Sequence, residues 1–157
     1  MVMHMIEKET EELKKILGNT HPEDISGFYE ENRESLSETP DAFHDYIRKI
    51  LKKNGISQQD AFLNADVPER YGYKLLTGEK HTKQRDVILR ICFAAGMTLD
   101  ETQKALRKYG MPELYARVPR DALLMTIFNN RPKNIIEVNR LLMKNKLQPL
   151  KTSGTQE

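Results

Sequence analysis

Apolar side chains recur at helical spacing along most of the chain. The clearest example places them at i, i+4, i+7 and i+8, at positions Phe43, Ile47, Ile50 and Leu51. This spacing predicts an amphipathic helix with Asp41 as its N-cap and Asn54-Gly55 at its end. No segment alternates apolar and polar residues over a sustained run, so no strand is predicted. The pattern therefore predicts an all-α fold.

Further helices are expected where the same spacing recurs between start and stop signals. They are expected over 58–65, 68–76, 82–95, 99–109, 120–128 and 135–142. Thr82 is the expected cap of the third of these. Thr98 and Glu101 have the spacing of a capping box, and Asn134 precedes the last helix as its cap.

The N-terminal region has its own, separate pattern. A helix carrying Ile6, Leu13, Ile16 and Leu17 is expected to end at Gly18, a residue that tolerates left-handed geometry. Thr20 to Glu23 has the form of a second capping box, followed by an apolar stripe that runs to about Leu36. The polar segment 35–40 then marks a domain boundary.

Charge divides the chain at the same boundary. Residues 1–40 carry 4 basic and 10 acidic side chains, a net charge of −6, whereas residues 41–157 carry 21 and 13, a net charge of +8. A basic body with an acidic arm indicates a polyanionic partner, although surface helices are often highly charged for solubility alone.

Composition narrows the class of protein further. The single cysteine, Cys92, excludes an internal disulfide framework and a cysteine-based zinc site. The longest uncharged apolar run, Ile91 to Met97, is too short to span a bilayer, and the N-terminus lacks a signal-peptide layout. We therefore expect a cytoplasmic protein without a membrane span.

Four segments follow from these patterns. We expect an acidic helical arm at 1–40, a basic helical domain at 41–98, a C-terminal helical extension at 99–150 and a disordered tail at 151–157.

Residues 57–78 are the part of the sequence most informative about function. Two short helices separated by a tight turn, the second one charged, are typical of a helix-turn-helix. The stretch Ile56 to Asp60, Val67 in the turn, Leu75 late in the second helix and the closing Gly78 resemble the lambda repressor/Cro-like family, also called XRE. The resemblance covers about residues 42–96. It implies a five-helix domain that binds double-stranded DNA as a transcriptional regulator, here with extra N- and C-terminal helices.

Three positions depart from the family pattern. Phe62 stands where the family has a small residue, and Gly72 stands where it has a branched aliphatic one. Because these positions face each other in the family, we expect Phe62 to pack over Gly72 and conserve the filled volume. Asp66 replaces the usual turn glycine, and aspartate tolerates left-handed geometry better than most residues.

The resemblance implies a set of residues that contact DNA. Gln58 and Gln59 begin the first helix of the unit, where an amide bonds a backbone phosphate. In the recognition helix the expected contacts are Glu69, Arg70, Tyr71, Tyr73 and Lys74. Arg70 is the best candidate for a bidentate contact to guanine. Tyr73 is equally compatible with burial. In the following loop the expected phosphate contacts are Lys80, His81, Thr82, Lys83 and Arg85.

No catalytic or cofactor motif accompanies this unit. The four histidines lack metal-ligand spacing, Cys92 reads as a buried structural residue, and no phosphate-binding glycine loop occurs. The pair Arg120-Asp121 reads as a helix cap with a helix-end ion pair. We therefore expect no enzyme, no metal and no cofactor.

Several alternatives stay open for partners. We expect a homodimer, as in the family, with Ile135, Val138, Leu142, Leu147 and Leu150 as one candidate contact surface and ordinary packing as the other interpretation. The acidic arm is expected to bind the body, a protein partner or a second copy. The main alternative to DNA binding is a non-enzymatic interaction module or antitoxin-like partner on the same fold. RNA binding is weaker, because no aromatic-rich sheet is evident.

Overall fold

The computed structural model describes residues 8–36, 40–131 and 134–152. Within these residues it contains nine α-helices, two short 3-10 helices and no strand, which confirms the all-α prediction. Residue contacts divide the chain into two compact units, residues 1–38 and 39–157. Each unit is described separately below.

The first unit is a helical hairpin. Its elements are α1 (Thr10–Gly18), η1 (Pro22–Asp24), α2 (Ile25–Glu31) and η2 (Arg33–Ser35). Phe28 and Asn32 are its only described side chains that are fully buried. The amide side chain of Asn32 donates to the Phe28 carbonyl and accepts from the Lys8 ammonium, which ties the segment before α1 to the end of α2.

Two sequence predictions for the hairpin are wrong in detail. The Thr20 hydroxyl bonds back to the Ile16 carbonyl at 2.7 Å and does not cap the next helix. Gly18 is the last residue of α1, as predicted, but it does not adopt a left-handed conformation. Ile6, the first residue of the predicted apolar stripe, lies outside the described residues.

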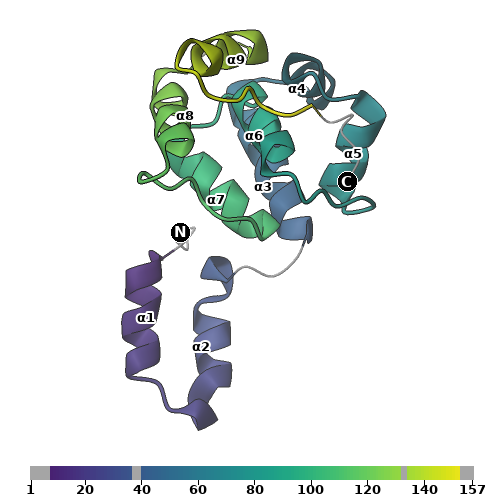
Figure 1. The fold of residues 1–157 in the computed structure, drawn as a ribbon. Helices are drawn as coiled ribbons and strands as arrows, with labels where there is room; N and C mark the ends of the chain where they lie inside the picture. The colour runs from purple at the N-terminus through teal and green to yellow at the C-terminus, as the bar shows by residue number, and fades with distance from the viewer. Residues whose placement is uncertain (1–7, 37–39, 132–133, 153–157) are drawn as a thin grey trace. The chain divides into compact units, whose positions relative to one another are not determined.

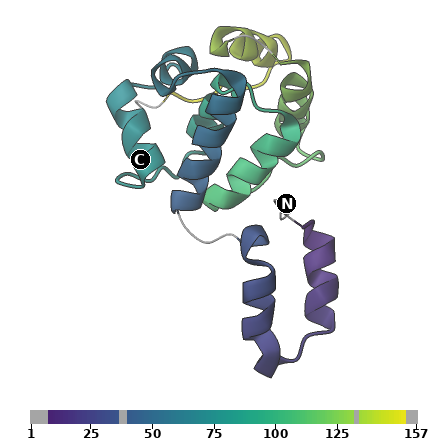
Figure 2. The same ribbon diagram turned by 180° about the vertical axis from the view of Figure 1, so that it is seen from behind.

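The described residues of the second unit form seven helices. They are α3 (Pro40–Asn54), α4 (Gln58–Ala65), α5 (Glu69–Thr77), α6 (Arg85–Ala94), α7 (Leu99–Tyr109), α8 (Pro119–Asn130) and α9 (Ile135–Lys144). Helices α3 and α6 run through the middle, with α4 and α5 on one side and α7 and α8 on the other (Figures 1 and 2). The predicted N-cap Asp41 falls inside the first turn of α3, one residue after its start.

Helix α6 forms the centre of the core. Nine of its residues, Asp86 to Ala94, are buried, because neighbours cover it on all sides. Phe93 stacks on Phe128 of α8 with ring centroids 3.6 Å apart. Phe43 of α3 meets Tyr109 of α7 edge-to-face at 4.7 Å. One continuous apolar cluster therefore joins helices α3 to α9.

Two of the four predicted helix caps of this unit are confirmed. Thr98 accepts from the Glu101 amide while the Glu101 side chain accepts from the Thr98 amide, so the capping box is confirmed. Asn134 caps α9 as predicted, through the Glu137 amide at 2.9 Å. The predicted cap Thr82 is wrong, because α6 begins at Arg85 with Gln84 at the N-cap position.

The C-terminal segment 147–152, which we call the strap, crosses over α6 (Figure 1). The guanidinium of Arg90, only 2% exposed, donates to the Leu150 and Lys151 carbonyls at 2.7 Å and to the Ala65 carbonyl at 3.0 Å. Asp86 accepts from the Lys151 amide at 2.9 Å and from Arg120. Burial lowers the pKa of Arg90. The negative charges of Asp66 and Asp86 act to raise this pKa, but burial has the larger effect.

Two apolar predictions are settled by burial. Ile135, Val138, Leu142 and Leu150 are at most 4% exposed, and Leu147 packs against the core, so this stripe is not a free self-association surface. Cys92 is fully buried, as predicted, and burial raises the pKa of its thiol to about 12. At that pKa the thiol is unreactive near neutral pH.

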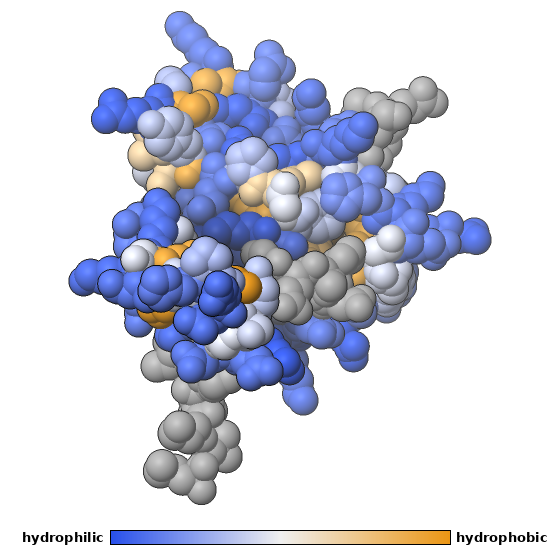
Figure 3. All heavy atoms as spheres, turned by 90° about the horizontal axis from the view of Figure 1, so that it is seen from below, coloured by the Kyte–Doolittle hydropathy of each residue, from blue (hydrophilic) through white to orange (hydrophobic). Residues whose placement is uncertain are grey.

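The visible surface is mostly polar. Figure 3 shows one face on which hydrophilic residues dominate and apolar side chains form small separate patches. None of the described helices is long and apolar enough to cross a membrane.

Candidate nucleic-acid interface

Helices α4 and α5 are joined by a turn of three residues. Ser57 caps α4 by accepting from the Asp60 amide at 3.0 Å. Asp66 then takes the left-handed conformation, with φ of 54°, which confirms the predicted use of aspartate in this turn. Helix α5 begins after Pro68 and stops at Gly78, whose φ is 82°. The predicted recognition helix, 68–76, is therefore displaced by one residue.

The predicted packing of Phe62 over Gly72 is confirmed. Phe62 is 1% exposed, and a Cβ atom placed on Gly72 would come within 2.5 Å of the Phe62 ring. The absence of a side chain at Gly72 therefore makes room for the ring. Helix α5 continues unbroken through Gly72, so its outer face is regular.

The outer face of α5 begins with two exposed charges, Glu69 and Arg70. Arg70 has no ion-pair or hydrogen-bond partner for its side chain among the described residues. Tyr73 is 40% exposed, with one ring edge against Phe62 at a centroid distance of 5.2 Å, so it is both packed and accessible. Tyr71 is half-buried against the core. Lys74 is half-buried and pairs with Glu79 at 3.9 Å.

The loop after α5 divides into exposed and buried residues. Lys80, His81 and Lys83 are exposed, and the His81 ring stacks on Tyr109 at 4.5 Å, which fixes its position. Thr82 is fully buried, and its amide donates to the Tyr109 hydroxyl at 2.9 Å. Thr82 is therefore a structural residue of the loop.

Arg85 is also engaged inside the protein. Its guanidinium forms a bidentate ion pair with Asp121, whose side chain is 4% exposed, and also donates to the Glu113 carbonyl. A guanidinium held in this way keeps no free pair of donors for another anion. We therefore leave Arg85 and Thr82 out of the interface that is proposed below.

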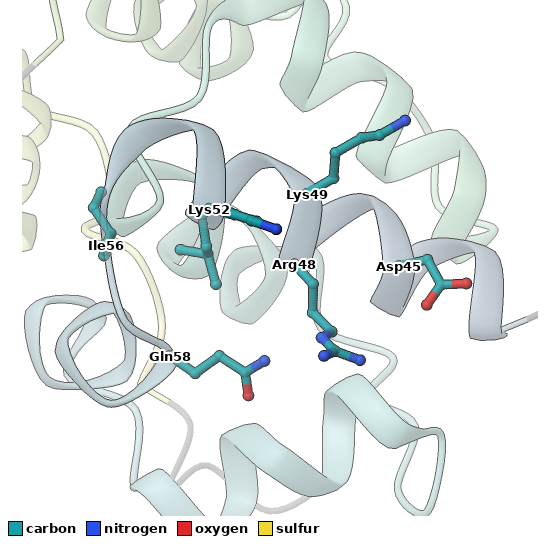
Figure 4. Close-up of a pocket in the computed structure, with 7 residues that line it drawn as sticks. Asp45, Arg48, Lys49, Lys52, Ile56 and Gln58 are labelled. Atoms are coloured by element: carbon teal, nitrogen blue, oxygen red, sulfur yellow. The ribbon is translucent and has the colours of Figure 1, made fainter.

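A hollow of about 470 Å³ lies between α3 and the start of α4. Its polar lining comes from Arg48, Lys49, Lys52 and Asp45 of α3 and from Gln58 of α4. Arg48 and Gln58 point into the same space, toward α5, whereas Lys49 points away from Gln58 (Figure 4). We call this space the α3–α4 hollow.

The α3 cations were missed by the sequence interpretation. Arg48 and Lys52 stand at i and i+4 on the polar face of α3, a spacing that places both on one side of the helix. That spacing could have been recognised in the sequence. Only the contact between α3 and α4, however, shows that these cations lie at the same hollow as Gln58. Within the described residues, Arg48, Lys49 and Lys52 have no ion-pair partner.

Gln59 faces a different feature. It lines a hollow of about 350 Å³ at the α4–α5 turn, together with Leu63, Pro68 and Glu69. Leu63 is 74% exposed, the most accessible large apolar side chain of α4. Gln59 and Gln58 therefore lie at different hollows, although they are adjacent in sequence.

The remaining polar groups do not assemble a reactive centre. Across the part of the chain that the structure describes, no three His, Cys, Asp or Glu side chains cluster as metal ligands would. Arg120 and Asp121 do not form the helix-end pair expected from the sequence, because Arg120 binds Asp86 and Asp121 binds Arg85. Both residues connect α8 to α6.

Comparisons of the chain with protein-family models, with curated proteins and with solved structures find no match. Function is therefore argued from the residues alone.

Proposed function

We propose that this protein binds double-stranded DNA in a sequence-specific manner and acts as a transcriptional regulator. In this proposal residues 41–98, which take in helices α3 to α6, are a lambda repressor/Cro-like domain, and the N-terminal half of α5 enters the major groove. A major groove is wide enough for one α-helix, whose side chains then read base edges.

The observation that carries the proposal is the exposed start of α5 with unpaired cations on the elements around it. Arg70 is exposed and without a partner among the described residues, so its planar fork is available for guanine O6 and N7. Glu69 beside it accepts from cytosine N4 or orients Arg70. Helix α3, which packs against α5, contributes the cations of the α3–α4 hollow.

Phosphate contacts follow from the same arrangement. Gln58 and Arg48 share one hollow, and an amide next to a guanidinium suits a backbone phosphate. Lys80, His81 and Lys83 offer a second group of donors in the loop after α5. Two groups of phosphate contacts on elements that flank a recognition helix fix its register on the duplex.

The primary test is a selection from random duplex DNA at physiological salt with the full chain. We expect enrichment of a defined motif, and a two-fold symmetric motif would also establish a dimer. Binding should weaken steeply with salt through counterion release. Failure to enrich any motif, together with salt-independent behaviour, would reject the proposal.

Arg70→Ala tests the role of the recognition helix directly. We expect it to cost about 1–3 kcal/mol of binding and to relax preference at one or two base positions. Arg140→Ala is the matched control, because Arg140 is also exposed and the change in net charge is the same. Equal losses for all sequences would assign Arg70 to a phosphate instead.

Arg48→Gln tests the α3–α4 hollow in the same assay. We expect a loss of affinity that is uniform across sequences, with the salt slope reduced by about 1. An unchanged slope would remove the α3–α4 hollow from the interface.

A protein-interaction module is the second candidate, and Leu63 favours it. This exposed leucine stands beside the hollow at the α4–α5 turn, where Pro68 is also exposed. An apolar contact of this kind is insensitive to salt, unlike DNA binding. Leu63→Ser should abolish such a contact and leave DNA affinity unchanged.

A further inference from the structure

A second polar hollow lies away from the start of α5, beside the strap. It has a volume of about 610 Å³, and it is lined by residues 83–86, by Arg120 of α8 and by residues 148, 149 and 151 of the strap. Sites for small molecules have volumes of this order. We call it the strap hollow.

The walls of the strap hollow are held in place by hydrogen bonds that join the strap to α6 and α8. Asp86 accepts from the Lys151 amide at 2.9 Å, and Arg120 donates to the Gln148 and Pro149 carbonyls at 3.1 Å. Arg90 holds the Lys151 carbonyl from below at 2.7 Å. The strap backbone is therefore fixed against α6, and so is the point from which the Lys151 side chain extends.

The charge that lines the strap hollow is mostly positive. Four cationic side chains face one carboxylate, that of Asp86. Arg120 is committed to Asp86, with bonds of 3.0 and 2.9 Å, and Arg85 is committed to Asp121. The ammonium groups of Lys83 and Lys151 have no ion-pair partner among the described residues. Two unpaired positive charges therefore remain.

The chemistry of these two groups selects the kind of ligand. A planar carboxylate is best bound by a guanidinium fork, and both arginines here already hold a carboxylate. Lysine binds phosphate as a compact point charge. Pro149 is the one apolar residue among those that line the strap hollow.

We propose that the strap hollow binds a small phosphorylated anion. Lys83, in the loop before α6, and Lys151, on the strap, supply the two positive charges that bind it. Gln84, which is half-buried, is also part of the lining. Binding of this anion does not depend on the proposed DNA function. If that function holds, Lys83 is shared, so the anion and the DNA backbone compete for it and each weakens the other.

The test is a titration of the full chain with pyrophosphate. Amide NMR spectra are recorded at each step, and sodium chloride keeps the ionic strength constant. We expect saturable shifts that are concentrated at residues 83–86 and 148–151. Inorganic phosphate should give the same pattern at lower affinity. Shifts that never saturate, or that spread evenly over the surface, would show that pyrophosphate only screens the surface charge. That result would overturn the proposal.

Lys151→Gln and Lys83→Gln should each weaken pyrophosphate binding about tenfold, the loss expected for one charge-assisted hydrogen bond. Both side chains are exposed, so both variants should fold, which circular dichroism checks. Lys144→Gln is the matched control, since it removes the same charge from the exposed end of α9. Equal weakening by the control would reject the site.

A DNA titration separates this proposal from the proposed function. Lys151→Gln should change pyrophosphate affinity and leave DNA affinity within about twofold, a difference below 0.5 kcal/mol. Loss of DNA affinity without any pyrophosphate site would show that the strap hollow is part of the DNA surface, and the proposal would fail. Saturable pyrophosphate binding without DNA binding would reject only the proposed function.

Discussion

The hairpin and the seven-helix unit are built from similar amphipathic helices, but they differ in how much they bury. In the hairpin, α1 has no buried residue and α2 has one, Phe28. In the larger unit, α6 alone buries nine. Helix spacing in the sequence is equally clear in both regions. The difference teaches that amphipathic spacing predicts a helix, whereas the number of neighbouring helices decides what its apolar face contributes to stability.

The two regions also differ in how their polar groups are used. Among the residues whose burial is described, the carboxylates of the hairpin are exposed, and the exposed residues Lys14 and Glu11 form an ion pair at 3.4 Å. In the larger unit, two arginine–aspartate pairs are partly buried, and Arg90 is fully buried. Exposed pairs contribute little to stability, whereas breaking a buried one is costly. Four matched pairs of substitutions test this contrast, from the largest expected effect to the smallest.

Truncating one phenylalanine in each region gives the largest difference. Phe128→Ala should cost about 3–5 kcal/mol of unfolding free energy, because it leaves a cavity beside Phe93. Phe28→Ala should leave the main unfolding transition unchanged within about 0.5 kcal/mol, as is usual for sites outside a core. Urea unfolding followed by circular dichroism measures both. A comparable loss for Phe28→Ala would mean that the hairpin belongs to the main core.

Removing one arginine charge from each region tests the polar contrast. Arg90→Leu should cost roughly 3 kcal/mol, because three buried carbonyls lose their donor. Arg33→Leu changes an exposed arginine of η2 and should cost almost nothing. Thermal unfolding of both variants compares them. Equal melting temperatures would contradict the structural role assigned to Arg90.

Adding a methyl group to one glycine in each region should produce effects of opposite sign. Gly72→Ala should destabilise by about 1–3 kcal/mol, because the new Cβ meets the Phe62 ring. Gly27→Ala has open space around it and should stabilise α2 by up to about 1 kcal/mol. Phe62→Leu combined with Gly72→Ala should recover part of the loss. If no recovery occurs, the two side chains do not share this volume.

Threonine at a helix start gives the smallest contrast. Thr98→Ala should cost about 1 kcal/mol, since Thr98 caps α7, while Thr20→Ala should cost less because Thr20 caps nothing. Denaturant midpoints measure both changes. Equal costs would mean that the capping box adds nothing beyond an ordinary hydrogen bond.

The same capping box gives a pH dependence. Burial acts to raise the pKa of Glu101, but hydrogen bonds from Lys53 and Thr98 outweigh it and hold the pKa below its ordinary value. Because the pKa is lower in the folded state, the stabilisation is present above about pH 4.3, the ordinary glutamate value. It is lost as pH falls through the folded-state pKa. Glu101→Gln should remove this part of the acid dependence.

Local signals in the sequence were sufficient for most helices of the larger unit. The capping box at Thr98, the cap Asn134, the left-handed Asp66 and the closing Gly78 each act within four residues, so their geometry follows from neighbours in the chain. The contact between Phe62 and Gly72 was also predictable, but only because the resemblance placed the two positions face to face.

Other features depend on residues that are distant in the sequence. Thr82 has the composition of a cap, yet Tyr109 holds its amide, 27 residues away in the sequence. Arg85 has the charge of a phosphate contact, yet Asp121 binds it from another helix. The α3 cations face Gln58 only after α3 packs on α4. None of these pairings has a spacing signal, because each depends on tertiary packing.

The bonds of Arg90 have a consequence for how the chain is made. Its carbonyl partners Leu150 and Lys151 follow 60 and 61 residues later, so they leave the ribosome well after α4, α5 and α6. Until then the guanidinium beneath the α4–α5 turn is without two of its acceptors, and long-range contacts of this kind form slowly. A nascent chain interrupted before Leu150 thus lacks two of the three carbonyl acceptors of Arg90, and we expect it to be less stable than the full chain.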